Sequence, residues 1–300
     1  MQRFLLPFAG LLAMVPALPA NAQPAEAAAP ADWTAACKDW DDWDKPGPPF
    51  RIHANSWYVG TCGIAAILVT SRQGHVLIDS GTEKGADVVA ANIRRLGFRL
   101  KDVKLLLHSH EHFDHVGGHE ALRRLTGAQV VASKEAAPAL ASGRDSHGDP
   151  QAGSLKPFAA MPVGRIVADG EAVRLGPLTL TAHATPGHTP GALTWTWTSC
   201  ARGQRGCRRI VYADSLSAIS ADAYRFSDHP AYVATFRAGI AKLPSLPCDI
   251  LLTPHPSASA LRERLASGSL TEPQDQCQTY ARNAGERLDE RLAREAGAKP

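Results

Sequence analysis

The stretch that decides the fold reads LHSHEHFDH and runs from Leu107 to His115. It follows the apolar run 103–107, which predicts a short strand, and five of the chain's twelve histidines lie between 108 and 119. Neutral imidazole is a good zinc ligand, and a loop at a strand end is a common place for a functional site. A lone histidine more often has a structural role. The His-x-His-x-Asp-His string instead predicts that His110 and His112 chelate one ion, while Asp114 and His115 offer a second pair of ligands.

Two further histidines stand at predicted strand ends. His188 lies in the turn TPGHTPG (185–191), and His255 follows the apolar strand 249–252 within TPHP (253–256). Either one alone would be weak evidence, but together with the string they complete two ligand sets. We assign no role to the histidines at 108, 119, 147, 183 and 229 and expect them to be structural or exposed.

Alternating strand and helix patterns flank these motifs. Strands are predicted at 56–60, 63–70, 75–78, 103–107, 128–132, 165–168, 171–175, 178–185, 192–198, 208–212 and 249–252, and helices at 83–96, 117–125, 134–140, 230–242, 258–266 and 274–295. The last helix is charged on most faces and is expected to be solvated. Each half of the chain thus supplies strands with interspersed helices. We predict an α/β fold, and an αββα sandwich of two mixed β-sheets facing each other with helices on the outside would satisfy the layer rule.

The segment 1–22 has the pattern of a cleavable signal peptide. Arg3 supplies a positive charge, the run 4–18 is apolar, and Ala20-Asn21-Ala22 is a small-x-small cleavage site. An uncleaved anchor is the alternative, but the run is short for a membrane span of about 20 residues. We therefore expect a periplasmic or secreted protein that is not membrane-bound after cleavage.

Residues 23–50 are predicted to be a flexible or irregular lead-in, and residues 51–300 a single catalytic domain. The lead-in holds Trp33, Trp40 and Trp43, which could pack over a site mouth but which we expect to cover core edges. The Gly/Pro/Ser/Asp-rich stretch 142–163 is expected to be a long loop, a type of segment that often acts as a functional lid. A net charge of +3 without a Lys/Arg run gives no reason to expect nucleic acid as a partner. No coiled-coil pattern or repeat is present, so a monomer is expected.

Six cysteines lie beyond the expected cleavage site. An even count in an exported chain predicts disulfides, and nearness in sequence favours the couples Cys37–Cys62, Cys200–Cys207 and Cys248–Cys277. Zinc thiolates are the alternative, but the chain has no CxxC motif and no cysteine beside the histidine string.

Four motifs in this order and spacing, HSHEHFDH, TPGHTPG, VYADSLSA and LLTPHPSAS, resemble those of the metallo-β-lactamases, specifically the third subclass of class B. The resemblance runs from about Trp57 to beyond Ser259. It implies the αββα fold and a site of two Zn²⁺ ions. His110, His112 and His188 would hold the first ion, and Asp114, His115 and His255 the second. In the other two subclasses a cysteine is a ligand near the position of Ser215, so the serine here fits the third subclass.

The resemblance also implies the reaction and its substrate. A metal-bound hydroxide would open the β-lactam amide ring of penicillins, cephalosporins or carbapenems, with Asp114 as the catalytic residue that orients the nucleophile. The chain has no S-x-x-K motif, which serine β-lactamases need. Ser215 and Ser217 look like the serines that bind the substrate carboxylate in this family, although a turn-capping role is the simpler interpretation.

Other interpretations stay open at this level. The superfamily also contains thioesterases, phosphodiesterases and lactonases, in which an aspartate commonly bridges the two metals, and Asp214 stands in such a position. A secreted lactonase or thioesterase is therefore the alternative enzyme, and a non-catalytic zinc-binding protein is the alternative outside catalysis. Asp79 either accepts a hydrogen bond from a ligating histidine or caps a turn.

Overall fold

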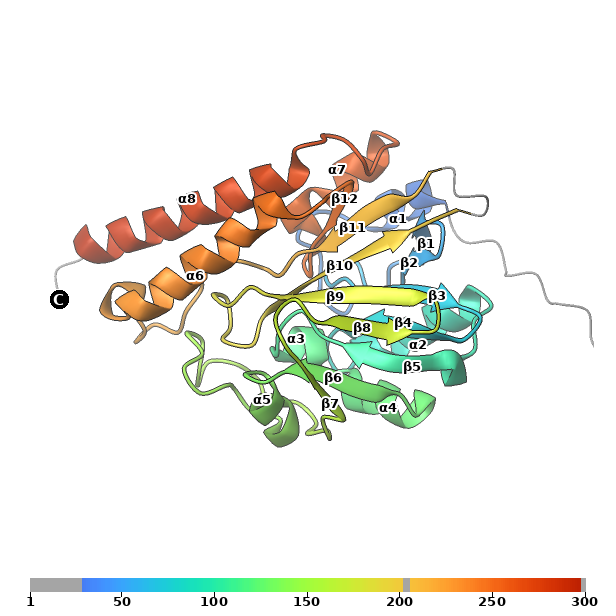
Figure 1. Cartoon of the computed structure of the whole chain (residues 1–300), viewed down its shortest axis with the longest axis horizontal. Coiled ribbons are helices and arrows are strands. Elements are labelled where there is room, and N and C mark those ends of the chain that lie inside the picture. Colours follow the sequence, from blue (N-terminus) through green and yellow to red (C-terminus); the bar gives the residue numbers. More distant parts are fainter. Residues whose placement is uncertain (1–28, 202–205, 298–300) are drawn as a thin grey trace, which may run out of the picture.

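The computed structural model describes residues 29–201 and 206–297 and contains two facing β-sheets with helices on both outer sides (Figure 1). This arrangement confirms the predicted αββα sandwich. The expected signal peptide, residues 1–22, lies outside the described residues.

The first sheet has seven strands in the order β1-β2-β3-β4-β5-β6-β7. Neighbours from β1 to β4 are antiparallel, and those from β4 to β7 are parallel. The strands are β1 (Phe50–His53), β2 (Ser56–Tyr58), β3 (Ile67–Ser71), β4 (Gly74–Ile78), β5 (Val103–Leu107), β6 (Gln129–Ser133) and β7 (Arg165–Val167).

The second sheet has five strands in the order β12-β11-β10-β9-β8. Its pairs are antiparallel from β8 to β11, and β12 joins β11 in parallel. The strands are β8 (Ala172–Leu175), β9 (Leu178–Ala184), β10 (Leu193–Ser199), β11 (Arg208–Tyr212) and β12 (Ile250–Leu252).

Helices cover the outer face of each sheet. Those beside the first sheet include α2 (Gly85–Arg95), α3 (Phe113–Val116), α4 (His119–Thr126) and α5 (Ala137–Ser142). Those beside the second sheet are α6 (Pro230–Lys242) and α8 (Gln276–Gly297), and α7 (Leu261–Ala266) packs with α1 (Pro30–Ala36).

The alternation of side chains along the strands produces separate hydrophobic cores. In β11, Ile210 and Tyr212 point into the core between the sheets, while Val211 points to the core beneath α6 and α8. In β4, Val76 and Ile78 likewise face the other sheet, and Leu77 faces the core that includes α2 and α4. The consecutive apolar residues 76–78 of β4 and 210–212 of β11 are therefore explained by burial on both faces.

Two segments differ from the expectation from sequence. The lead-in contains the helix α1, whose Trp33 is buried against Phe50 and Tyr58. The terminal helix α8 is amphipathic and not solvated all round, because a side that includes Tyr280 and Leu288 is buried in the core with α6. High charge on the other faces of α8 concealed this apolar stripe.

The six cysteines form three disulfides, Cys37–Cys62, Cys200–Cys207 and Cys248–Cys277, which are the couples favoured by nearness in sequence. The first ties α1 to the turn after β2, the second lies beyond β10 and before β11, and the third ties α8 to the segment before β12. Among the described residues, none of the helices combines the length and apolarity needed to span a bilayer.

We expect the Cys248→Ser/Cys277→Ser double variant to lose about 3–4 kcal/mol of unfolding free energy and Cys200→Ser/Cys207→Ser about 2 kcal/mol, because the longer loop gains more chain entropy in the unfolded state. The two bridges close sequence separations of 29 and 7 residues. Urea unfolding followed by circular dichroism measures both. Equal losses, or a larger loss for the shorter loop, would contradict this ranking.

Candidate metal centre

Three imidazoles meet at the loop ends beside the two sheets. His110 and His112 follow β5, and His188 lies in the turn between β9 and β10. Ring centroids are separated by 4.8 Å for His110–His112, 4.7 Å for His110–His188 and 4.8 Å for His112–His188. These three residues lie up to 78 positions apart in the chain. The fold brings them together as a buried triangle that is able to hold one metal ion.

The turn that carries His188 depends on close packing against α6. A Cβ on Gly187 would come within 2.0 Å of the Phe236 ring, so a residue with a side chain cannot occupy this position unless α6 moves. The Gly187 amide donates to the Thr189 carbonyl at 3.1 Å, which closes the turn around His188. The glycine before His188 is therefore required by packing, and it fixes where the imidazole enters the site.

One nitrogen of each imidazole is held by a neighbouring segment. His110 Nδ1 lies 2.8 Å from Asp214 Oδ1, His112 Nε2 lies 2.9 Å from Asp149 Oδ2, and His188 Nδ1 lies 3.0 Å from the Ser217 carbonyl. The other nitrogen of His110, Nε2, is buried and has no hydrogen-bond partner. Donation from one ring nitrogen leaves the lone pair of the other free for a metal, as in protein metal sites generally.

A second group of possible ligands adjoins this triangle. His110, Asp114 and His115 have ligand atoms within 4.8 Å of one another. Asp114 Oδ2 lies 3.0 Å from His115 Nε2 and 3.4 Å from His255 Nε2. His255 thus approaches Asp114 and His115 as the sequence predicts, although it is not within the tight group, and its ring centroid is 5.0 Å from that of His115.

Burial makes the charges in this region costly. It raises the pKa of Asp214 to about 7 and, together with the neighbouring imidazoles His115 and His188, holds the pKa of His110 well below its ordinary value. Asp214 therefore needs a positive charge nearby to remain ionised, and His110 does not readily supply it by protonation. A cation on the free nitrogen of His110 would satisfy both groups, so these residues fit a bound metal.

Asp79 joins the first ligand loop to the second sheet. It accepts hydrogen bonds from the Ser109 amide and hydroxyl and from the Tyr212 hydroxyl, each at 2.7 Å. Its Oδ2 is 3.6 Å from His115 Nδ1, an ion-pair contact. Asp79 therefore orients the loop that follows β5 and lies beside Nδ1 of His115.

The two serines predicted to bind a substrate carboxylate have different surroundings. Ser215 Oγ is buried and has no hydrogen-bond partner. Ser217 Oγ lies 2.9 Å from His188 Nδ1, which also contacts the Ser217 carbonyl. The Tyr280 hydroxyl of α8 donates to the carbonyls of Asp214 and Ser215 and so fixes this segment. The carboxylate-binding role of both serines stays a prediction.

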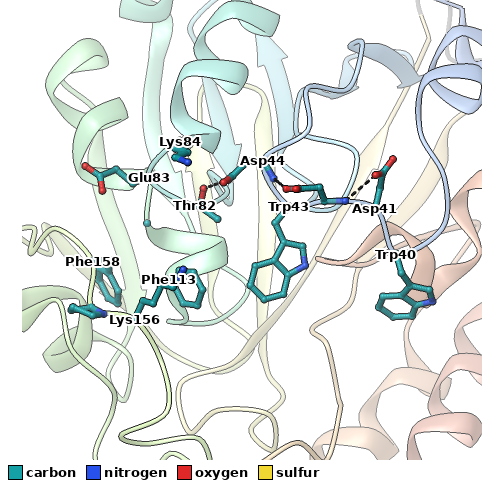
Figure 2. A pocket seen from close by; sticks show the side chains of 13 residues that line it. Trp40, Asp41, Trp43, Asp44, Thr82, Glu83, Lys84, Phe113, Lys156 and Phe158 are labelled. Carbon is teal, nitrogen blue, oxygen red and sulfur yellow. Dashed lines mark hydrogen bonds between the residues drawn. The ribbon is translucent and has the colours of Figure 1, made fainter.

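Two of the lead-in tryptophans lie at the site mouth, not at core edges. Trp43 has its ring centroid 5.7 Å from that of His255 and 5.8 Å from that of Phe113, and Trp40 lies 6.2 Å from His255. Trp40 and Trp43 line a pocket of about 520 Å³. Figure 2 shows these two rings on one side of the pocket, with Phe113 and the long-loop residues Lys156 and Phe158 on the other. The lead-in and the long loop thus form facing walls beside the metal centre.

Two supporting carboxylates, Asp149 and Glu111, had no role in the sequence analysis. Asp149 lies in the long loop and Glu111 lies between two ligands, and both are buried. Glu111 alternates with the histidines of the string, so only its position inside that motif could have drawn attention to it. Nothing in the local sequence identifies Asp149.

We expect Asp214→Asn to weaken metal binding by about 10- to 100-fold, because the amide cannot hold the His110 tautomer and orientation as a carboxylate does. Competition with a chromophoric chelator measures the affinity. Asp289→Asn, at an exposed position on α8, is the matched control and should bind metal as the unmodified protein does. Unchanged affinity in Asp214→Asn would remove this carboxylate from the support of the centre.

Comparison with known proteins agrees with this geometry. The family model described as the metallo-beta-lactamase superfamily matches residues 59–200. Among curated relatives, a hydroxyacylglutathione hydrolase of Anaeromyxobacter dehalogenans is 30% identical over 169 residues, which cover 56% of this chain and 52% of that protein. The chain thus spans about half the length of the curated relatives it matches.

Solved structures match over almost their full length. The MIM-2 metallo-β-lactamase is 55% identical, with 89% of this chain and 98% of that chain covered and a TM-score of 0.84. MIM-1 from Novosphingobium pentaromativorans is 49% identical, with 89% and 98% covered and a TM-score of 0.86. MEM-A1, a subclass B3 enzyme from a soil metagenome, is 46% identical, with 86% and 100% covered and a TM-score of 0.81. The chain belongs to the metallo-β-lactamase family and, within class B, to its third subclass.

Proposed function

We propose that this protein is a di-zinc hydrolase that opens the β-lactam ring of penicillins, cephalosporins and carbapenems and so confers antibiotic resistance. The observation that carries the proposal is the buried triangle of His110, His112 and His188. One nitrogen of each ring is hydrogen-bonded to a carboxylate or carbonyl oxygen, which leaves the other nitrogen for a metal. The names of the similar solved structures, all metallo-β-lactamases, support the substrate class.

The donors suit two zinc ions. His110, His112 and His188 would hold the first, and Asp114, His115 and His255 the second. Imidazole nitrogen and carboxylate oxygen are preferred zinc donors, and three protein ligands per ion leave coordination positions open for substrate and water. Open positions favour catalysis over the alternative of a zinc site that only stabilises the fold.

When bound, the two ions supply Lewis acidity to the lactam carbonyl and increase the acidity of the attacking water. Asp114 would orient that water by accepting its hydrogen bond at a carboxylate oxygen. The water oxygen forms a bond to the carbonyl carbon, the carbon–nitrogen bond of the ring breaks, and the proton passes through Asp114 to the lactam nitrogen. Because Asp114 is buried beside His115 and His255, its position is fixed before the substrate arrives.

The walls of the site offer groups for the rest of the substrate. The Ser215 hydroxyl is buried without a protein partner, so donating to the substrate carboxylate would break no existing hydrogen bond. The Ser217 hydroxyl can do the same, because the His188 N–H can donate to the Ser217 carbonyl instead. The aromatic rings of Trp43 and Phe113 offer apolar surface to a substrate side chain (Figure 2).

A secreted lactonase or thioesterase of the same fold is less well supported. Asp214, the candidate bridging ligand of those enzymes, has Oδ1 engaged by His110 Nδ1, and its Oδ2 receives the Leu216 amide at 3.4 Å. The Asp214 carboxylate thus contacts Nδ1 of His110, while the free nitrogen of that ring is Nε2. Asp214 belongs to neither of the tight groups of possible metal ligands.

The proposal includes the wider organisation of the protein. Residues 1–22 act as a cleaved signal peptide, residues 51–300 form the catalytic domain, and the cleaved protein works as a monomer in the periplasm or outside the cell. A β-lactamase located there meets its substrate before the antibiotic reaches the cell interior.

The direct test is hydrolysis of a penicillin and a carbapenem by the purified cleaved protein, followed by absorbance loss with and without EDTA. We expect ring opening that EDTA stops and added zinc restores. A protein that binds two zinc ions but opens neither substrate would contradict the proposal and would lead next to lactones and thioesters.

We expect Ser215→Ala to raise KM by roughly 3- to 10-fold while kcat and zinc affinity stay close to those of the unmodified protein, since one hydrogen bond to a charged group is lost in the bound state. Steady-state kinetics on a penicillin, with zinc content measured in parallel, give these values. A fall in kcat at unchanged KM would show that the hydroxyl does not contact the ground-state carboxylate.

A further inference from the structure

Glu111 is a buried carboxylate that none of the roles above uses. It lies between the ligands His110 and His112 and is only 1% exposed. It accepts hydrogen bonds from Ser146 Oγ at 2.6 Å, Thr189 Oγ1 at 2.7 Å and the Gly191 amide at 3.1 Å. Thr189 and Gly191 belong to the His188 turn, so the Glu111 side chain connects both loops that carry the proposed ligands to the long loop.

The long loop closes on itself over residues 143–158, where the Phe158 amide donates to the Gly143 carbonyl at 3.0 Å. Segments of this length with adjacent ends are Ω-loops, and we use that name for 143–158. Within the Ω-loop, Ser146 and Asp149 are 5% and 3% exposed, while the residues at 144, 147 and 148 are exposed. Both of these buried polar side chains contact the metal centre.

The second contact acts directly on a ligand. Asp149 Oδ2 is 2.9 Å from His112 Nε2, and its Oδ1 accepts the Gln151 amide at 2.7 Å. A proton fixed on His112 Nε2 leaves the Nδ1 lone pair for metal. The Ω-loop therefore determines the tautomer of His112, while Glu111 ties the same loop to the turn that carries His188.

These contacts make loop order and ligand geometry depend on each other. If the Ω-loop opened, Glu111 would lose one of its three donors and His112 its acceptor, and a buried charged group that loses a partner is strongly penalised. Metal binding requires the ligand geometry, so metal favours the closed loop. By reciprocity, contacts that favour the closed loop increase metal affinity by the same factor.

We propose that Glu111 is a positioning residue that couples closure of the Ω-loop to metal binding, with Ser146 as its contact on the loop. The inference rests on the proposed metal centre but not on the β-lactam substrate. Its consequence concerns specificity, because Lys156 and Phe158, at the end of the Ω-loop, line the pocket beside the site (Figure 2). The metal-loaded protein would then present a complete pocket wall, and the metal-free protein an incomplete one.

The experiment compares hydrogen–deuterium exchange of the amides in 143–158, with and without zinc, in the unmodified protein and in Ser146→Ala. Zinc affinity is measured in parallel by competition with a chelator. Ser146→Ala removes a bond to Glu111 without altering a ligand. The matched control is Ser154→Ala, in the same loop, whose hydroxyl bonds only the nearby Gln151 carbonyl.

We expect zinc to slow exchange in the Ω-loop of the unmodified protein and of Ser154→Ala. In Ser146→Ala the slowing should be smaller and zinc affinity roughly fivefold lower. If zinc does not alter loop exchange in the unmodified protein, the inference is overturned even where β-lactams are hydrolysed. If the coupling is present but no β-lactam is opened, the proposed function fails and this inference stands.

A second pair of variants tests Glu111 itself. Glu111→Gln keeps one acceptor oxygen, and its amide can donate to a reoriented Thr189 hydroxyl, so zinc affinity and loop protection should stay close to those of the unmodified protein. Glu111→Ala should lose both together. Loss of thermal stability in Glu111→Ala with unchanged zinc affinity and unchanged loop protection would assign Glu111 a purely structural role and overturn the inference.

Discussion

The hydrogen bond between His110 and Asp214 holds the two halves of the molecule in the arrangement on which the metal centre depends. The residues are 104 positions apart, one in the loop after β5 and the other in the segment after β11. A second hydrogen bond also joins the two sheets. Asp79, at the end of β4 in the first sheet, accepts it from the Tyr212 hydroxyl of β11 in the second. Because both carboxylates are fully buried, neither can exchange its protein partner for water, and the facing sheets are held in one relative position.

Much of the fold could be predicted because its signals are local. The apolar residues 105–107 of β5 and 250–252 of β12 are consecutive, as expected for segments that are buried on both faces. The helix α1 was missed because it is short and lies in an Ala/Pro-rich segment, where composition suggests disorder. Its burial depends on the distant Phe50 and Tyr58 and on the Cys37–Cys62 bridge, and no local pattern reports such contacts.

The site follows the same division between local and distant signals. The clustering of these histidines could be predicted because a dense string is improbable unless it binds metal, and because His188 and His255 each follow a strand. Their supports could not, since Asp149 contacts His112 across 37 positions, and Glu111 contacts Gly191 across 80. From sequence alone, a carboxylate in a polar loop is expected to be solvated, because only the folded structure shows which residues bury it. Trp40 and Trp43 are a similar case, because an aromatic residue that covers a core and one that lines a pocket look alike in sequence.

The balance of charge in the interior links these observations to stability. The following carboxylates are all at most 5% exposed: Asp79, Glu111, Asp114, Asp149 and Asp214. Within the described ranges 29–201 and 206–297, their ion pairs are with histidines only, and none is paired with lysine or arginine. Burying several negative charges without fixed cations is strongly unfavourable. Two divalent ions would supply the missing positive charge, and because they bind the folded chain, they would also stabilise it. The supporting carboxylates would therefore orient the proposed ligands and, at the same time, make the stability of the folded state increase when metal binds.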